Sequence, residues 1–273
     1  MKIHFVLVSL LLTPLAVAQV KPADVDAFIT DTAQQFDLDA ASIRTILNQA
    51  KHQQSIIDAM NKPAEKVLEW YQYRPIFITD KRIKEGVEFW QQNAEVLQQV
   101  SDQTQIPVNI IVAIIGVETY YGRIMGNHKV LDALYTLAFD YPKRSAFFTK
   151  ELGHFLKLSA DGHVSALDAK GSYAGAMGYG QFMPSSYRSY AVDYENDGVI
   201  DLLSNPHDAI ASVANYIAKH GWQKGQPVVA EASQPDGTIK LNQLKPHLTD
   251  NQGQDYTLIA MKTDEDTTAY WQG

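Results

Sequence analysis

The chain has 273 residues, of which 45% are hydrophobic and 20% are charged, so it can bury the core of one large domain or of two unequal ones. Its formal net charge is -8 and it has no basic stripe, which excludes a nucleic-acid-binding protein that relies on phosphate contacts. The sequence contains no cysteine, which excludes disulfide bonds and lipid attachment to a cysteine.

The first 18 residues have the pattern of an export signal. Lys2 precedes an apolar run over residues 5–12, and the small residues Ala16, Val17 and Ala18 follow it. This order predicts a secretory signal peptide that is cut after Ala18. The alternative is a membrane anchor, but the run is shorter than the roughly 20 apolar residues that span a bilayer. We expect a soluble mature chain without a transmembrane segment.

Residues 19–106 carry a helical pattern that is interrupted by Pro, Asp and Asn, so we expect several helices that pack together. The clearest of them has apolar residues at i, i+4, i+7, i+11 and i+14, and this apolar stripe is predicted to face a core. The stripe consists of Ile83, Val87, Trp90, Ala94 and Leu97.

The next helix is predicted to begin at Pro107, which suits the first helical position, and to stop near Gly122, which suits a left-handed cap. From there to Trp222, helices alternate with glycine-rich and acidic loops, and we find no convincing strand. We therefore expect residues 107–222 to form an α-helical core.

Glu118 is the unusual residue of this helix. Together with Ile111, Ile114 and Ile115 it falls at i, i+3, i+4 and i+7, so its carboxyl group continues the apolar face. Burial and the negative end of the helix dipole would both raise the pKa of Glu118. A raised pKa keeps a proton available for general acid catalysis. The alternative is a partly solvated glutamate at a helix end.

Residues 171–180 form a loop with four glycines, which lets the backbone pass close to another surface. It is not a phosphate-binding loop, because the Gly-Lys-Ser/Thr ending of the Walker pattern is missing. Tight helix packing on the glycines is the alternative.

A short acidic loop follows. Asp193, Glu195 and Asp197 stand at positions 1, 3 and 5 of an EF-hand-like pattern, with glycine at 6 and the carbonyl of Val199 at 7. Such oxygen ligands favour calcium. Position 12 is Ser204 instead of the usual bidentate glutamate, so the pattern is incomplete, and a solvated acidic turn is the alternative.

After Gly221 the pattern changes. Residues 228–229, 238–241 and 256–261 are typical of short strands, and a Pro-Asp-Gly turn lies at 235–237. We expect a small β subdomain over residues 223–273.

Two strings carry a family resemblance. Residues 116–122 (GVETYYG) and 171–186 (GSYAGAMGYGQFMPSS) resemble the two signatures of the lytic murein transglycosylase B family. The similarity continues through residues 131–134 and 211–216, and covers roughly residues 22–222. It implies a mainly α fold: a lysozyme-like α-helical catalytic core at 107–222, an N-terminal helical region at 19–106 and the small β subdomain.

The resemblance implies that Glu118 protonates the glycosidic oxygen between N-acetylmuramic acid and N-acetylglucosamine. The same carboxylate then takes the proton of the muramoyl C6 hydroxyl, which attacks C1 and forms a 1,6-anhydro ring. Most glycosidases need two carboxylates. A lone glutamate fits if the N-acetyl group of the substrate stabilises the positive charge at C1.

The resemblance also implies substrate-binding residues. Ser172 and Gln181 match polar groups of the family's groove, while Tyr73, Phe182 and Tyr216 match its aromatic walls, on which sugar rings stack. Tyr73 and Tyr216 are otherwise ordinary core residues.

The family's acidic loop closes on a later aspartate. That residue matches Asp208 here, and with it the expected ligands of a structural calcium ion are Asp193, Glu195, Asp197, Val199 and Asp208. We expect no organic cofactor.

The sequence thus predicts a periplasmic, monomeric lytic transglycosylase that acts on peptidoglycan glycan strands. A hydrolytic muramidase is one alternative. The other is an inactive peptidoglycan-binding protein, because the sequence stops at Gly273 where family members continue into further helices.

Overall fold

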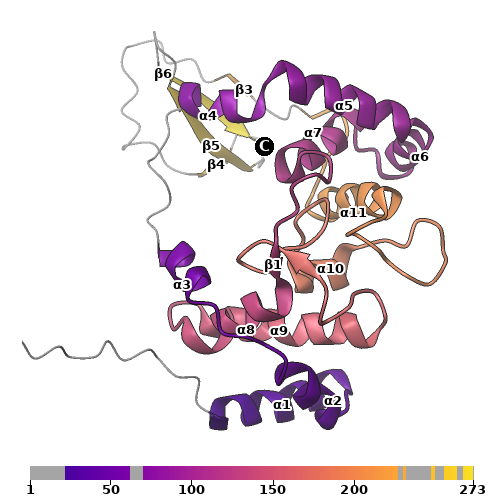
Figure 1. Cartoon of the computed structure of the whole chain (residues 1–273). Coiled ribbons are helices and arrows are strands. Elements are labelled where there is room, and N and C mark those ends of the chain that lie inside the picture. Colours follow the sequence, from indigo (N-terminus) through magenta and orange to yellow (C-terminus); the bar gives the residue numbers. More distant parts are fainter. Residues whose placement is uncertain are drawn as a thin grey trace, which may run out of the picture.

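The computed structural model describes residues 22–61, 70–226, 230–231, 247–249, 255–262 and 267–272. The predicted signal peptide and the predicted turn at 235–237 lie outside these residues. The helices are α1 (Pro22–Phe36), α2 (Ala40–Leu47), α3 (Gln54–Asn61), α4 (Trp70–Phe77), α5 (Asp80–Gln92), α6 (Ala94–Thr104), α7 (Val108–Thr119), α8 (Val130–Asp140), α9 (Ser145–Ala160), α10 (Pro184–Tyr190) and α11 (Pro206–Lys219) (Figure 1). The predicted mainly α fold is therefore confirmed.

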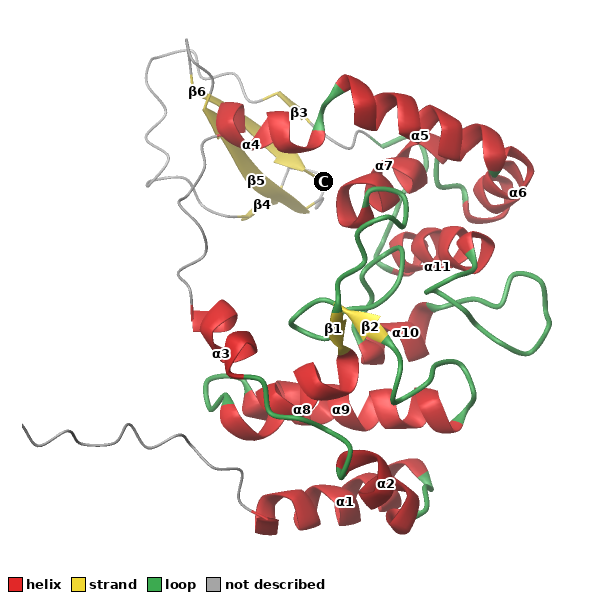
Figure 2. Cartoon of the chain, in the orientation of Figure 1, coloured by secondary structure: helices red, strands yellow, loops and turns green. Residues whose placement is uncertain are grey.

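The strands form two antiparallel sheets. β1 (His128–Lys129) pairs with β2 (Lys170–Gly171), and β3 (Ala230–Glu231), β4 (His247–Thr249), β5 (Asp255–Lys262) and β6 (Thr267–Gln272) form a sheet in the order β3-β6-β5-β4 (Figure 2). The strand predicted at 256–261 is confirmed, since it lies within β5. The pair β1–β2 was not predicted, because two residues per strand are too few to give a period.

One hydrophobic core joins the helices that surround the predicted catalytic region. α8 and α9 pack on each other, α10 packs on α9, and α11 packs on α6 and α7. Two buried polar side chains add hydrogen bonds to this packing, one between two helices and one between a helix and a loop. Glu151 of α9, 4% exposed, accepts hydrogen bonds from the backbone N–H (2.9 Å) and the hydroxyl (2.7 Å) of Ser185. Tyr187 of α10 donates to the carbonyl of Ile200 (2.8 Å) and accepts from the N–H of Leu202 (3.0 Å).

The prediction that the apolar stripe faces a core is mostly wrong. Ile83, Val87 and Trp90 are 55%, 50% and 39% exposed, while Leu97 alone is fully buried. The stripe runs across a break between α5 and α6 at Asn93, so its members do not lie on one continuous helix. α5 instead buries the face that carries Gly86, because the side chain of Tyr121 packs beside this glycine.

The side chain of Tyr121 fills the space beside Gly86. A Cβ atom added to Gly86 would overlap the Tyr121 hydroxyl, and the Tyr121 ring stacks on Phe89 with 5.6 Å between ring centroids. Gly86 and Phe89 are the buried residues of α5.

In the described residues no single helix is long and apolar enough to cross a membrane. α6 and α7 together reach the required length, but they are bent by 114° at their junction. The junction begins with Gln105 in a left-handed conformation (φ 62°) and ends with Pro107, which caps α7 from just outside the helix instead of opening it.

Candidate active site

Glu118 lies in the last turn of α7. Ile111 and Ile115 are fully buried, as the spacing predicts, and Ile114 is half-buried. Glu118 itself is exposed by more than a third, which corrects the prediction of a buried carboxylate. The core ends one turn earlier, and in the last turn Thr119 faces inward instead. Partial burial still raises the pKa of the Glu118 carboxyl group above its usual value of 4.5.

Left-handed residues end α7. Tyr120, Tyr121 and Gly122 have φ values of 53°, 58° and 83°, so the predicted left-handed cap begins two residues before Gly122. Gly122 is needed there, because a Cβ atom would overlap the ring of Tyr179. Thr119 holds the turn: its hydroxyl accepts from the N–H of Gly122 (3.0 Å) and donates to the carbonyl of Tyr179 (2.8 Å).

A charged cluster supports this turn from α5. The guanidinium of Arg82 donates to the carbonyl of Gly116 (3.2 Å) and lies 4.5 Å above the Tyr120 ring. The hydrogen bond from Tyr120 lowers the pKa of Glu85, which also forms an ion pair with Arg123. Sequence analysis missed this cluster, because its charges look like an ordinary solvated helix face. The available signal was the presence of Arg82 and Glu85 close to Gly86 on α5.

The glycine-rich loop lies next to this turn. Gly175 and Gly178 have φ values of 86° and 70°, and an added Cβ atom would overlap Leu134 or the backbone of Leu202, respectively. The loop thus requires glycine for conformation as well as for close approach. Ser172 stabilises the loop internally, since its hydroxyl accepts from the N–H groups of Ala174 (3.3 Å) and Ala176 (3.1 Å).

α7, the end of the glycine-rich loop and α11 border a pocket of about 400 Å³. We call it the Glu118 pocket. It is mainly apolar, with one carboxyl group. Its lining residues are Ile114, Glu118, Gly180, Gln181, Phe182, Met183, Ser186, Val213, Tyr216 and Ile217. The structure therefore brings Glu118, Gln181, Phe182 and Tyr216 together.

The aromatic residues of this pocket differ in exposure. Phe182 is 6% exposed and Tyr216 is 38% exposed, and their rings meet edge to face at 5.7 Å. Tyr216 also stacks on His220 at 4.0 Å. Gln181 is fixed by its side-chain amide, which donates to the carbonyls of Met125 (3.2 Å) and Gly178 (3.1 Å).

The structure does not bring the other two predicted substrate-binding residues into this pocket. Ser172 and Tyr73 are not among the described residues that line it. Tyr73 lies on α4, is 45% exposed and contacts Phe77 with 4.9 Å between ring centroids.

The acidic loop is held by its own carboxylates. Asp193 accepts from the N–H groups of Asp197 (3.1 Å) and Gly198 (2.8 Å), and Asp197 accepts from the N–H of Val199 (2.8 Å). Each of these bonds closes a turn within the loop.

Asp208 lies at the start of α11 and is fully buried. It accepts from the N–H groups of Tyr194 (2.8 Å) and Asp201 (2.7 Å), and burial raises the pKa of its carboxyl group. Glu195 points to His207, with 2.6 Å between Oε1 and Nδ1, and accepts from Asn205 (3.0 Å).

The predicted calcium ligands are thus near one another in the chain but are not assembled. Among the residues that the structure describes, no group of three His, Cys, Asp or Glu side chains is arranged to hold a metal ion. The donors have the right chemistry, since all are oxygens, but Glu195 is paired with a histidine.

The family model described as a transglycosylase SLT domain matches residues 21–269. The chain belongs to this family. A curated relative, membrane-bound lytic murein transglycosylase B of Escherichia coli (strain K12), is 44% identical over 215 residues, which are 76% of this chain. The chain spans 59% of the length of that relative. The resemblance to the lytic murein transglycosylase B family is confirmed.

Three solved structures of lytic transglycosylases are similar to this chain. The soluble lytic transglycosylase SltB1 from Pseudomonas aeruginosa has a TM-score of 0.84 and 40% identity, with 91% of this chain and 88% of that chain covered. Escherichia coli Slt35 in complex with calcium has a TM-score of 0.79 and 38% identity (95% and 88% covered). SltB3 from P. aeruginosa in complex with NAG-NAM-pentapeptide has a TM-score of 0.78 and 28% identity (90% and 71% covered). These neighbours confirm the lysozyme-like helical fold.

Proposed function

We propose that the chain is a lytic transglycosylase that cleaves the β-1,4 bond between N-acetylmuramic acid and N-acetylglucosamine in peptidoglycan. The observation that carries this proposal is the position of Glu118. It is a carboxyl group with a raised pKa in an apolar pocket, beside aromatic rings, in a chain of the SLT transglycosylase family.

The reaction needs one group that gives a proton and later takes one. Protonated Glu118 donates to the glycosidic oxygen as the bond from that oxygen to C1 breaks, and the N-acetyl group of the muramoyl residue stabilises the charge at C1. The carboxylate then takes the proton of the C6 hydroxyl, whose oxygen bonds to C1. Two-carboxylate glycosidases activate water instead, and among the described residues Glu118 is the one carboxylate that lines the pocket.

Sugar binding is proposed for the five other residues of the predicted site. Tyr216 offers an exposed ring face, and the largely buried Phe182 packs against it. Gln181 offers an amide whose oxygen accepts no hydrogen bond from the described residues. Ser172 acts through the shape of the glycine-rich loop. For Tyr73, which lies on α4 outside the Glu118 pocket, the proposal rests on the family resemblance and on its 45% exposure. Because a related protein holds NAG-NAM-pentapeptide, we include peptide-bearing strands among the substrates.

The location and assembly are proposed as well. The signal-like residues 1–18 and the peptidoglycan substrate support a periplasmic location after signal cleavage. We also propose that the chain acts as a monomer.

Calcium binding at the acidic loop is a further part of the proposal, supported by the oxygen donors and by the calcium complex of Slt35. It requires Glu195 to leave His207 and turn toward Asp193 and Asp197. The test is thermal unfolding of the full chain in calcium and in chelator. We expect a higher Tm in calcium, and no such rise for Asp193→Asn. An equal Tm for the unsubstituted chain in both conditions removes calcium from the account.

The activity is tested with purified chain and isolated cell-wall sacculi. For Glu118→Gln we expect release of soluble fragments to fall by about 10²- to 10⁴-fold, the usual contribution of a general acid or base. The control Glu95→Gln alters an exposed carboxylate on α6 and should keep full activity. Mass spectrometry should find 1,6-anhydro ends. Reducing ends would indicate hydrolysis, and undiminished release by Glu118→Gln would remove this residue from the mechanism.

A further inference from the structure

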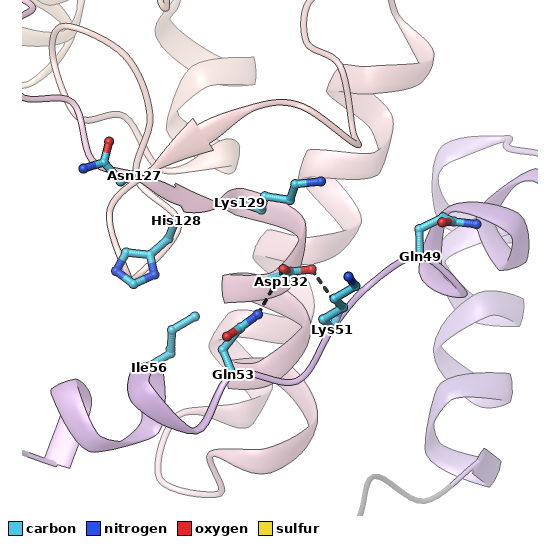
Figure 3. Close-up of a pocket in the computed structure, with 8 residues that line it drawn as sticks. All are labelled: Gln49, Lys51, Gln53, Ile56, Asn127, His128, Lys129 and Asp132. Carbon is cyan, nitrogen blue, oxygen red and sulfur yellow. Dashed lines mark hydrogen bonds between the residues drawn. The ribbon is translucent and has the colours of Figure 1, made fainter.

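A second pocket lies away from Glu118, between the segment that joins α2 to α3 and the start of α8 (Figure 3). Its volume is about 370 Å³, close to that of the Glu118 pocket. We call it the lysine pocket. Its lining residues are Gln49, Lys51, Gln53, Ile56, Asn127, His128, Lys129 and Asp132.

The lysine pocket has a rigid frame. Asp132 of α8, 7% exposed, accepts from the backbone N–H of Lys51 (2.8 Å) and from the side-chain amide of Gln53 (3.4 Å). The N–H of Gln53 donates to the hydroxyl of Thr136 (3.0 Å), and Ile56 is fully buried. The α2–α3 segment is therefore fixed on α8, and its side chains surround a cavity of defined shape.

The charge of this pocket is opposite to that of the whole chain. Lys51 and Lys129 are exposed, and among the described residues neither ammonium group makes a hydrogen bond or an ion pair. The negative charge of Asp132 is already engaged by two donors. The pocket also lies at the first turn of α8, where the helix dipole favours anions. In a chain of net charge -8, this is a local site for an anionic ligand.

The remaining groups suit a peptide. Gln49 and Asn127 carry exposed amides that can donate to and accept from a peptide backbone. Figure 3 shows the ring of His128 extending from β1 toward Ile56 of α3. Two cations and two amides match a short acidic peptide better than a sugar chain, which would need aromatic faces.

The two pockets border the same loop. Gln181 lines the Glu118 pocket and donates to the carbonyl of Met125, and Asn127, two residues later, lines the lysine pocket. In the β1–β2 pair His128 stands opposite Gly171, where the glycine-rich loop begins. Residues 125–128 therefore connect the two pockets.

We propose that the lysine pocket binds the acidic stem peptide that branches from the glycan strand held at Glu118, with Lys51 and Lys129 contacting its free carboxylates. This inference rests on the proposed function and adds to it the residues that select peptide-bearing strands. Lys51 and Lys129 are specificity residues and take no part in the bond cleavage.

The test compares two substrates that differ in the peptide alone: glycan strands with stem peptides, and the same strands after an amidase has removed the peptides. For the double variant Lys51→Gln/Lys129→Gln we expect kcat/KM on peptide-bearing strands to fall by at least about tenfold, because loss of a single charge-assisted contact already predicts that factor and the variant removes both. On peptide-free strands the rate should be unchanged. The control Lys84→Gln/Lys150→Gln removes the same charge from exposed sites on α5 and α9 and should match the unsubstituted chain on both.

A binding measurement separates this inference from the proposed function. Calorimetric titration of the full chain with a free acidic pentapeptide needs no catalysis, so it remains informative if neither strand is cleaved. We expect binding that weakens with salt and weakens by at least about tenfold in the lysine double variant. The inference is overturned by equal peptide affinity in both proteins, by undetectable binding to the unsubstituted chain, or by an equal loss of activity on both kinds of strand.

Discussion

The Glu118 pocket and the lysine pocket have nearly the same volume, about 400 and 370 Å³, but opposite chemistry. In the first, apolar neighbours desolvate a single carboxyl group and raise its pKa. In the second, exposed lysine side chains lie beside amides. The comparison teaches that low polarity suits a pocket that must hold a proton, whereas solvated charge suits one that selects an anionic branch of the substrate.

The largest expected effect that is confined to one of the two pockets is that of Gly122→Ala. Gly122 has φ 83° and lies against the Tyr179 ring, so we expect a loss of about 2–4 kcal/mol in the free energy of unfolding, together with a distorted Glu118 pocket. Glycan cleavage should fall, while binding of the acidic pentapeptide should persist. Chemical denaturation and calorimetry measure the two effects.

Gly162→Ala is the matched control. Gly162 has nearly the same φ, 84°, but apart from its chain neighbours no atom of the described residues lies within 4 Å of an added Cβ, so only backbone strain of about 1 kcal/mol is expected. Equal losses for the two substitutions would contradict the close contact at Gly122.

Asp132→Asn should have the opposite effect, because it disturbs the lysine pocket and leaves the Glu118 pocket intact. Asparagine can no longer accept from both Lys51 and Gln53 with carboxylate oxygens, so we expect a loss of about 1–3 kcal/mol in stability and weaker pentapeptide binding. Cleavage of peptide-free strands should change little. If that cleavage falls as much as pentapeptide binding, the two pockets are not independent. Asp168→Asn, at an exposed site, is the control.

A smaller effect concerns pH. Because burial raises the pKa of Glu118 above 4.5 in the folded chain, the folded state holds this proton more tightly than the unfolded state does. The contribution of Glu118 to stability is therefore full below the unfolded pKa and is lost as pH rises through the folded pKa. Thermal unfolding between about pH 4 and pH 8 should show this decline for the unsubstituted chain relative to Glu118→Gln. Parallel curves would exclude the shift.

The smallest effect is expected outside both pockets, on the exposed part of the stripe. Val87→Thr should change the free energy of unfolding by less than about 0.5 kcal/mol, because Val87 is 50% exposed. Leu97→Ala, at the buried end of the same stripe, should cost about 2–5 kcal/mol. Similar costs would show that Val87 is buried in solution.

The sequence predicts the Glu118 pocket far better than the lysine pocket, for a physical reason. α7 and the glycine-rich loop each carry their signature within one short segment, so Glu118 and Gln181 are found by pattern. Lys51 and Asp132 are 81 residues apart and meet only through the fold, so no local pattern marks them.

Other misses have the same origin. The exposure of Glu118 depends on where the core ends, and the burial of α5 depends on Tyr121 inserting beside Gly86. In the acidic loop the spacing of carboxylates is readable from sequence, but the preference of Glu195 for His207 is set by side-chain geometry.

The central claim is that the apolar lining of its pocket keeps Glu118 protonated above the pH at which an ordinary glutamate ionises. The most direct measurement is an NMR titration of the labelled carboxyl carbon of Glu118, assigned by its absence in Glu118→Gln. The account predicts a midpoint above the usual 4.5. A midpoint at or below that value would contradict it.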